Sequence, residues 1–150
     1  MTNPDLLVKR ALAAVIDDII KFLLCIGTGG ILWLGSYMIS LLPSSPIRGI
    51  IAILWLLLML LLLFLIPFLY HILLESHLGK GQTLGKRILK IKVTTLDGKV
   101  PSYSQATIRT ILRLVDNCFF YLVGLAVILL SEKDQRIGDI LANTIVVEEK

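Results

Sequence analysis

Apolar residues dominate two long stretches of the chain, and their spacing predicts two membrane helices. The clearer stretch covers residues 49–74 and contains no formal charge, whereas about 20 apolar residues suffice to cross a bilayer. None of its helical faces is polar, so lipid can contact most of its circumference. The other stretch covers about residues 6–42, with an uncharged part over 22–42. Because Pro43–Pro46 is a strong helix breaker, we expect the two helices to form an antiparallel hairpin.

The pattern changes at residues 75–103, which form a polar and basic loop. Within it, apolar and polar residues alternate over 89–94, which is the period of a strand with one wet face. Asp97–Gly98 follows, and this pair is typical of a hairpin turn. We therefore expect a small segment similar to a β-hairpin in this loop.

An amphipathic helix and a third apolar segment are expected over 104–131. Residues 119–130 carry no charge but are too few to cross a bilayer on their own. The polar tail, 132–150, ends in a strand-like run at 144–147. If that run pairs with the strand near 89–93, the tail lies on the same side as the loop, and the third segment is re-entrant or lies flat. If the third segment crosses once, the tail lies outside.

Composition agrees with a membrane protein. Hydrophobic residues make up 56% of the 150 residues and charged residues 17%, with a mean hydropathy of +0.85, whereas soluble domains average about 45–50% and about 25%. We expect one domain over 1–150, an all-α membrane protein built from a helical hairpin and a third membrane or re-entrant helix.

Charge predicts the orientation. The segment from Glu75 to Arg113 holds eight Lys or Arg residues, whereas the turn between the first two helices holds only Arg48. Basic residues near membrane spans stay in the cytoplasm. The N-terminus and the middle loop are therefore expected in the cytoplasm, in a protein that crosses the membrane more than once.

Charged residues on the first helix are the leading candidates for function. Arg10, Asp17 and Lys21 lie on one helical stripe, because each residue turns the helix by about 100°. Asp17 and Lys21 are neighbours at i,i+4, whereas Asp18 points elsewhere. Ionisable side chains in membrane segments often mark ion or proton pathways; the alternatives are a structural ion pair or charges at the cytoplasmic interface.

Two further clusters are weaker candidates. In the run 81–87, Lys86 and Arg87 form a basic turn that suits anionic headgroups, since its spacing does not match a phosphate-binding loop. Arg136 and Asp139 are spaced to pair across one turn, which at a surface stabilises little. Asp116 would enter the membrane if the third segment crosses.

Several classes of function are not expected. The chain has no nucleophile motif, no metal-ligand spacing and no nucleotide motif. We therefore expect no enzymatic activity, no metal, no cofactor and no nucleic acid partner. The expected partners are the lipid bilayer and either further copies of the chain or another membrane protein.

Three separated motifs, in this order, resemble the RDD family of small bacterial membrane proteins. They are residues 10–17 (RALAAVID), 81–87 (GQTLGKR) and 135–144 (QRIGDILANT), where the family more often has Gly at 143. The resemblance covers about residues 5–148. It implies that Arg10, Asp17 and Asp139 are the family residues, with Asp18 as an alternative for one aspartate.

The resemblance implies a location in the inner (cell) membrane of a bacterium but no substrate. Transport of unknown ligands has been suggested for the family, and cation/proton exchange for some members. We therefore expect a protein that transports a small ion or solute. The alternative is a membrane partner or regulatory protein that does not transport and acts through its basic loop.

Overall fold

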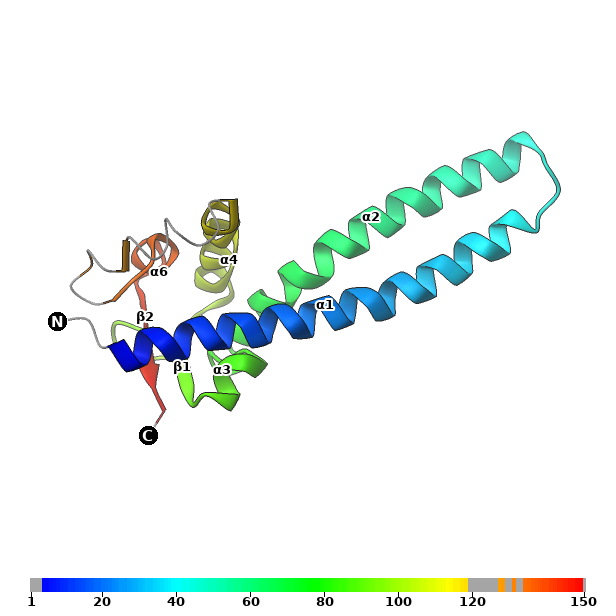
Figure 1. Cartoon of the computed structure of the whole chain (residues 1–150). Helices are drawn as coiled ribbons and strands as arrows, with labels where there is room; N and C mark the ends of the chain where they lie inside the picture. Colours follow the sequence, from blue (N-terminus) through cyan, green and yellow to red (C-terminus); the bar gives the residue numbers. More distant parts are fainter. Residues whose placement is uncertain (1–3, 119–126, 129–130, 132–133, 150) are drawn as a thin grey trace. The chain divides into compact units, whose positions relative to one another are not determined.

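The computed structural model describes residues 4–118, 127–128, 131 and 134–149, and it describes side chains for the same residues except 114–118. The described elements are mostly helices (Figure 1). In order they are α1 (Pro4–Ser40), α2 (Pro46–Glu75), α3 (Leu84–Ile88), β1 (Ile91–Thr95), α4 (Tyr103–Cys118), α6 (Ile137–Leu141) and β2 (Thr144–Glu148). The third apolar segment, 119–130, and the Asp116 side chain lie outside what is described.

The described chain divides into two compact units, one formed by residues 19–69 and the other by the remaining residues at both ends. The unit of residues 19–69 is a helical hairpin, made of α1 from Ile19 onward and of α2 as far as Leu69. Gly35 leaves room for the Trp55 ring, because a Cβ there would lie 2.2 Å from a ring carbon. The Trp55 indole donates to the Leu32 carbonyl at 3.1 Å.

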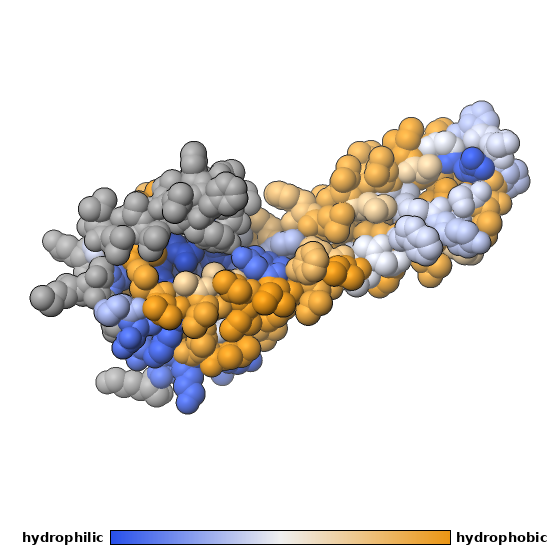
Figure 2. Space-filling view, viewed as in Figure 1, coloured by the Kyte–Doolittle hydropathy of each residue, from blue (hydrophilic) through white to orange (hydrophobic). Residues whose placement is uncertain are grey.

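The hairpin exposes apolar side chains on its outer faces. Within the described residues, α2 is the one helix that is long and apolar enough to cross a membrane, and none of its most apolar window is buried. Exposed residues include Trp33 on α1 and Leu54 on α2, at 69% and 62%. Hydrophobic residues cover most of the visible hairpin in Figure 2.

The other unit contains a small core and the two strands. Ala13, Ile91, Val93 and Val146 form the buried centre, and Leu6 and Leu89 pack against it. The strands β1 and β2 are antiparallel, with Val93 opposite Val146. In each strand the buried residues are apolar or threonine: Ile91, Val93 and Thr94 in β1, and Thr144 and Val146 in β2.

The expected local β-hairpin is wrong. The turn at 97–98 exists, and Gly98 adopts a φ of 78° there, but it returns the chain only to Lys99, whose carbonyl accepts from Thr95 N at 2.8 Å. Pro101 and the start of α4 follow, so no second strand is adjacent in sequence. The tail pairs with β1 instead, which is the alternative that the strand-like run at 144–147 allowed.

Candidate functional site

Asp17 is the centre of the first polar cluster. Its carboxylate is 2% exposed and accepts hydrogen bonds from three uncharged groups. The Tyr70 hydroxyl and the Gly85 backbone N–H each lie 2.8 Å from Oδ1, and the Thr83 hydroxyl lies 2.5 Å from Oδ2. Three donors of this kind satisfy much of the hydrogen-bonding capacity of a buried carboxylate.

The residue types in the run 81–87 are explained by the close packing of α3 on α1. Thr83 is the N-cap of α3, and its hydroxyl accepts from Lys86 N while donating to Asp17. Gly85 is required, because a Cβ there would lie 2.4 Å from the Ala13 carbonyl oxygen and 3.0 Å from the Asp17 carboxyl carbon. The glycine and threonine of this motif therefore position α3 against the first helix.

Glu75 is the centre of the second cluster. It is fully buried, and three cations surround its carboxylate. Lys86 Nζ lies 2.6 Å and Arg113 Nη2 2.7 Å from Oε1, while Arg109 Nε lies 3.0 Å from Oε2. The His71 ring nitrogen Nδ1 is 3.8 Å from Oε1.

Such a cluster depends on mutual neutralisation. A buried charge without a partner costs several kcal/mol, and burial lowers the pKa of the Lys86 ammonium to about 8, although the Glu75 carboxylate opposes that shift. Lys86 was expected to contact lipid headgroups from a basic turn. It is instead 8% exposed and paired within the protein, because it lies on the inner side of α3.

Asp139 is the centre of the third cluster and is also 2% exposed. Arg10 Nη2 donates to Oδ2 at 2.7 Å, Arg109 Nη1 donates to Oδ1, and the Arg136 backbone N–H donates to Oδ2 at 3.1 Å. Burial would raise the pKa of this carboxyl, but Arg109 and Arg10 outweigh burial and hold it below its ordinary value.

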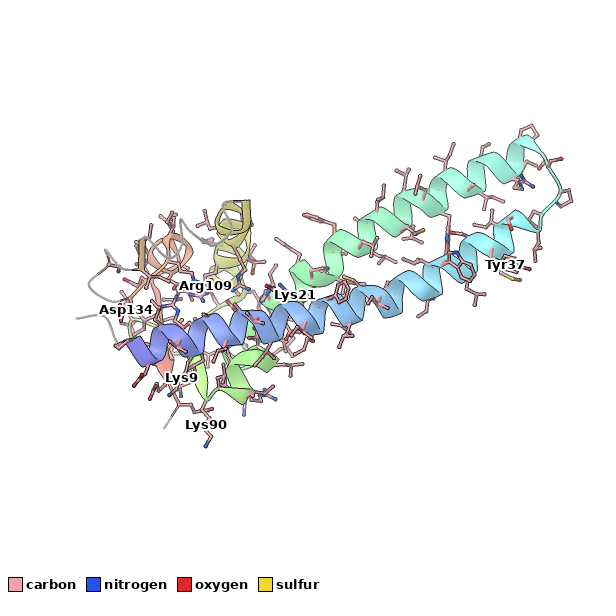
Figure 3. The ribbon with its side chains drawn as sticks, in the orientation of Figure 1. Lys9, Lys21, Tyr37, Lys90, Arg109 and Asp134 are labelled. Atoms are coloured by element: carbon pink, nitrogen blue, oxygen red, sulfur yellow. The ribbon has the colours of Figure 1, made fainter. Side chains whose placement is uncertain are left out.

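Arg109 joins the second and third clusters. It points from α4 toward the acidic side chains (Figure 3), where Nε contacts Glu75 and Nη1 contacts both Asp139 and the Thr144 hydroxyl, the latter at 2.7 Å. A guanidinium suits this position because its donors diverge in one plane. One buried side chain thus connects the end of α2, α6 and the start of β2.

Five of the predicted site residues fall into these clusters, with pairings that differ from the predicted ones: Arg10, Asp17, Lys86, Arg136 and Asp139. Arg10 and Asp17 were expected on one stripe of the first helix, but Arg10 pairs with Asp139, and Asp17 accepts hydrogen bonds from uncharged donors. The Arg136–Asp139 pair was expected at a surface. Asp139 is instead buried, and its carboxylate accepts a hydrogen bond from the backbone N–H of Arg136. Helical geometry within α1 could not reveal partners that come from the other end of the chain.

Asp18, Lys21 and Arg87 lie elsewhere. Asp18 and Lys21 are half-buried on α1, and Arg87 is exposed on α3. Sequence reasoning did not select Glu75 or Arg109: both fell within the basic segment from Glu75 to Arg113, which was used only to predict the orientation. A usable signal was present, since Arg109 and Arg113 lie four residues apart on one face and Glu75 directly follows an uncharged run.

No curated protein and no solved structure matches this chain. The model of the RDD family, a membrane-associated family, matches residues 5–143. The matched residues include Arg10, Asp17 and Asp139. They also include the run 81–87, in which Thr83 and Gly85 donate hydrogen bonds to Asp17. The chain therefore belongs to the RDD family.

Proposed function

We propose that this chain is an integral membrane protein that exchanges a small cation for a proton at Asp17. One observation supports the choice of this carboxylate above all. Glu75 and Asp139 are each bound by at least two cationic side chains. In the part of the chain that the structure describes, the three groups seen to donate to Asp17, from Tyr70, Thr83 and Gly85, are uncharged. A carboxylate whose charge is already neutralised by arginine or lysine side chains would gain little from binding a further cation.

The atoms around Asp17 suit a hard cation. Both carboxylate oxygens and the hydroxyl oxygens of Thr83 and Tyr70 lie together, and alkali and alkaline-earth ions prefer oxygen ligands. Each hydroxyl group donates to the carboxylate, and it presents a lone pair to a bound cation once its hydrogen rotates away. A proton on the carboxyl would replace the cation, which gives competition between the two.

The membrane assignment is supported by α2, whose most apolar stretch contains no buried residue. Leaving so many apolar side chains in water would be costly. We propose that α2 and the uncharged part of α1, residues 22–40, cross the bilayer. The N-terminus and the loop after α2 then lie in the cytoplasm, as the basic residues indicate.

The strand pairing constrains this topology. Because β1 and β2 are hydrogen-bonded to each other, residues 91–95 and 144–148 lie on the same side of any bilayer that the chain spans. The chain between these two strands therefore cannot cross the bilayer just once, because that would place the strands on opposite sides. Two crossings are too few to enclose a pathway, so transport requires an oligomer.

Reconstitution tests the proposal. Purified protein in proteoliposomes with a pH-sensitive dye inside should give a pH change on addition of Na⁺ or K⁺, and Asp17→Asn should abolish it. Asp18→Asn, which neutralises the next carboxylate on the same helix, is the matched control and should retain exchange. Both variants must first elute as monodisperse protein with the wild-type thermal transition.

Other outcomes reject the proposal. If the wild type is silent for every cation, or if Asp17→Asn retains full exchange while Asp18→Asn does not, then Asp17 is not the exchanging group. A silent wild type that co-purifies with one membrane protein would favour the second candidate, a partner or regulatory protein without transport. The exposed basic residues Arg87 and Lys90 favour that alternative.

A further inference from the structure

The short helix α3 is held rigidly from its inner side. Thr83, Gly85 and Lys86 are buried and make the contacts to Asp17 and Glu75. On the outer side, Leu84 is 40% and Ile88 is 64% exposed. These two residues are four apart and therefore lie on one helical face. The protein thus fixes two apolar side chains in the solvent-facing direction.

The neighbouring part of α1 continues this apolar surface. Val8, Leu12 and Val15 are 54%, 49% and 55% exposed, and their spacing places them on one side of the helix. Close contact between Gly85 and Ala13 sets α3 against this part of α1. Figure 2 shows hydrophobic residues gathered over α1 and α3, with hydrophilic residues at their edge.

Two basic residues border the apolar pair on α3. Arg87 is exposed, and so is Lys90, which adopts a left-handed φ of 54° as its N–H donates to the Arg87 carbonyl at 3.2 Å. This turn ends α3 and directs Lys90 outward, away from the ribbon (Figure 3). Apolar side chains bordered by cations are the pattern of segments that lie in the interface of an anionic bilayer.

We propose that the α3 face, formed by Leu84, Arg87, Ile88 and Lys90, docks onto the anionic cytoplasmic surface of the membrane. Leu84 and Ile88 enter the boundary between headgroups and acyl chains, and Arg87 and Lys90 contact lipid phosphates. Charge complementarity identifies the occupant as anionic lipid. This inference rests on the membrane location proposed above and adds a lipid class to it.

Site-specific quenching tests the proposal on the full chain. Cys25 and Cys118 are first replaced by Ala; then Ile88→Cys is labelled with an environment-sensitive fluorophore and the protein is placed in nanodiscs of mixed phosphatidylglycerol and phosphatidylcholine. Bromine is carried by one lipid at a time. The label should be quenched more strongly by brominated phosphatidylglycerol than by brominated phosphatidylcholine, by at least about twofold.

Removing the two charges should remove this preference. Arg87→Gln combined with Lys90→Gln should bring the quenching ratio of the two lipids to about one, since each basic residue near the surface attracts anionic lipid. Lys92→Gln combined with Lys99→Gln removes the same charge from the same loop and should leave the ratio unchanged. An unchanged ratio in the first pair would overturn the proposal.

A second label separates this inference from the membrane assignment. Leu56→Cys lies in the middle of α2 and should be quenched equally by both lipids if α2 crosses the bilayer. Quenching at Leu56→Cys without quenching at Ile88→Cys would show that the α3 face contacts water or another protein. Absence of quenching at both positions would reject the membrane location itself and this inference with it.

Discussion

Arg10 Nη2 lies 2.7 Å from Asp139 Oδ2, although 129 positions separate the two residues in the chain. Both side chains are almost completely buried, at 6% and 3% exposure. The other oxygen of Asp139 accepts from Arg109. One carboxylate therefore joins the first helix, α4 and α6, and the described elements at the two ends of the chain depend on it.

Stability should fall in acid because of Asp139. The folded protein holds the pKa of this carboxyl below its ordinary value of 3.8, so the folded state binds a proton less readily than the unfolded state. Its contribution is complete above about pH 4 and is lost as pH falls below that value, through the lowered folded pKa. Thermal unfolding in detergent should show a shallower acid limb in Asp139→Asn than in the wild type.

Glu75→Gln should lower the free energy of unfolding by about 3–5 kcal/mol, because three buried cations lose their common partner. Glu148→Gln is the matched control. Glu148 pairs with Lys9 at 2.5 Å, but both side chains are well exposed, so its loss should cost no more than about 1 kcal/mol. Denaturant titration in mixed micelles measures both; equal effects would contradict the burial argument.

Thr83 should tolerate serine but not valine. Thr83→Val keeps the shape and removes the hydroxyl that caps α3 and donates to Asp17. The expected cost is about 2–4 kcal/mol, since a cap and a hydrogen bond to a charged group are lost together. Thr83→Ser retains both bonds and should stay within about 1 kcal/mol of the wild type. The thermal midpoints of the two variants give the comparison.

Gly85→Ala should lower the free energy of unfolding by about 1–3 kcal/mol, because the added methyl overlaps the Ala13 carbonyl. Gly27→Ala is the control. Gly27 lies within α1 with open space at its Cβ position, and alanine there should be neutral or stabilising by up to about 1 kcal/mol. A Gly85→Ala variant with the wild-type midpoint would disprove the close approach of α3 to α1.

The long elements were predictable because their signals are local. The absence of charge over 49–74 indicated α2, the breaker at 43–46 indicated the turn that precedes it, and the alternation near 89–94 indicated a strand that the structure places at 91–95. The identity of the strand's partner was not predictable from that pattern. An exposed edge accepts any strand that reaches it, and β2 lies about 50 residues away along the chain.

The sequence alone determined which charged residues need partners inside the protein. Arg10 and Asp17 stand out as charges within an apolar helix, and Asp139 as the acidic residue of the motif 135–144. Their partners were decided by folding. Arg10 pairs with Asp139, Asp17 with Thr83, and Glu75 with Arg109, because a buried charge is stabilised by whichever complementary group the packed backbone brings within about 3 Å. Helical periodicity describes neighbours on one helix and contains no information about that distance.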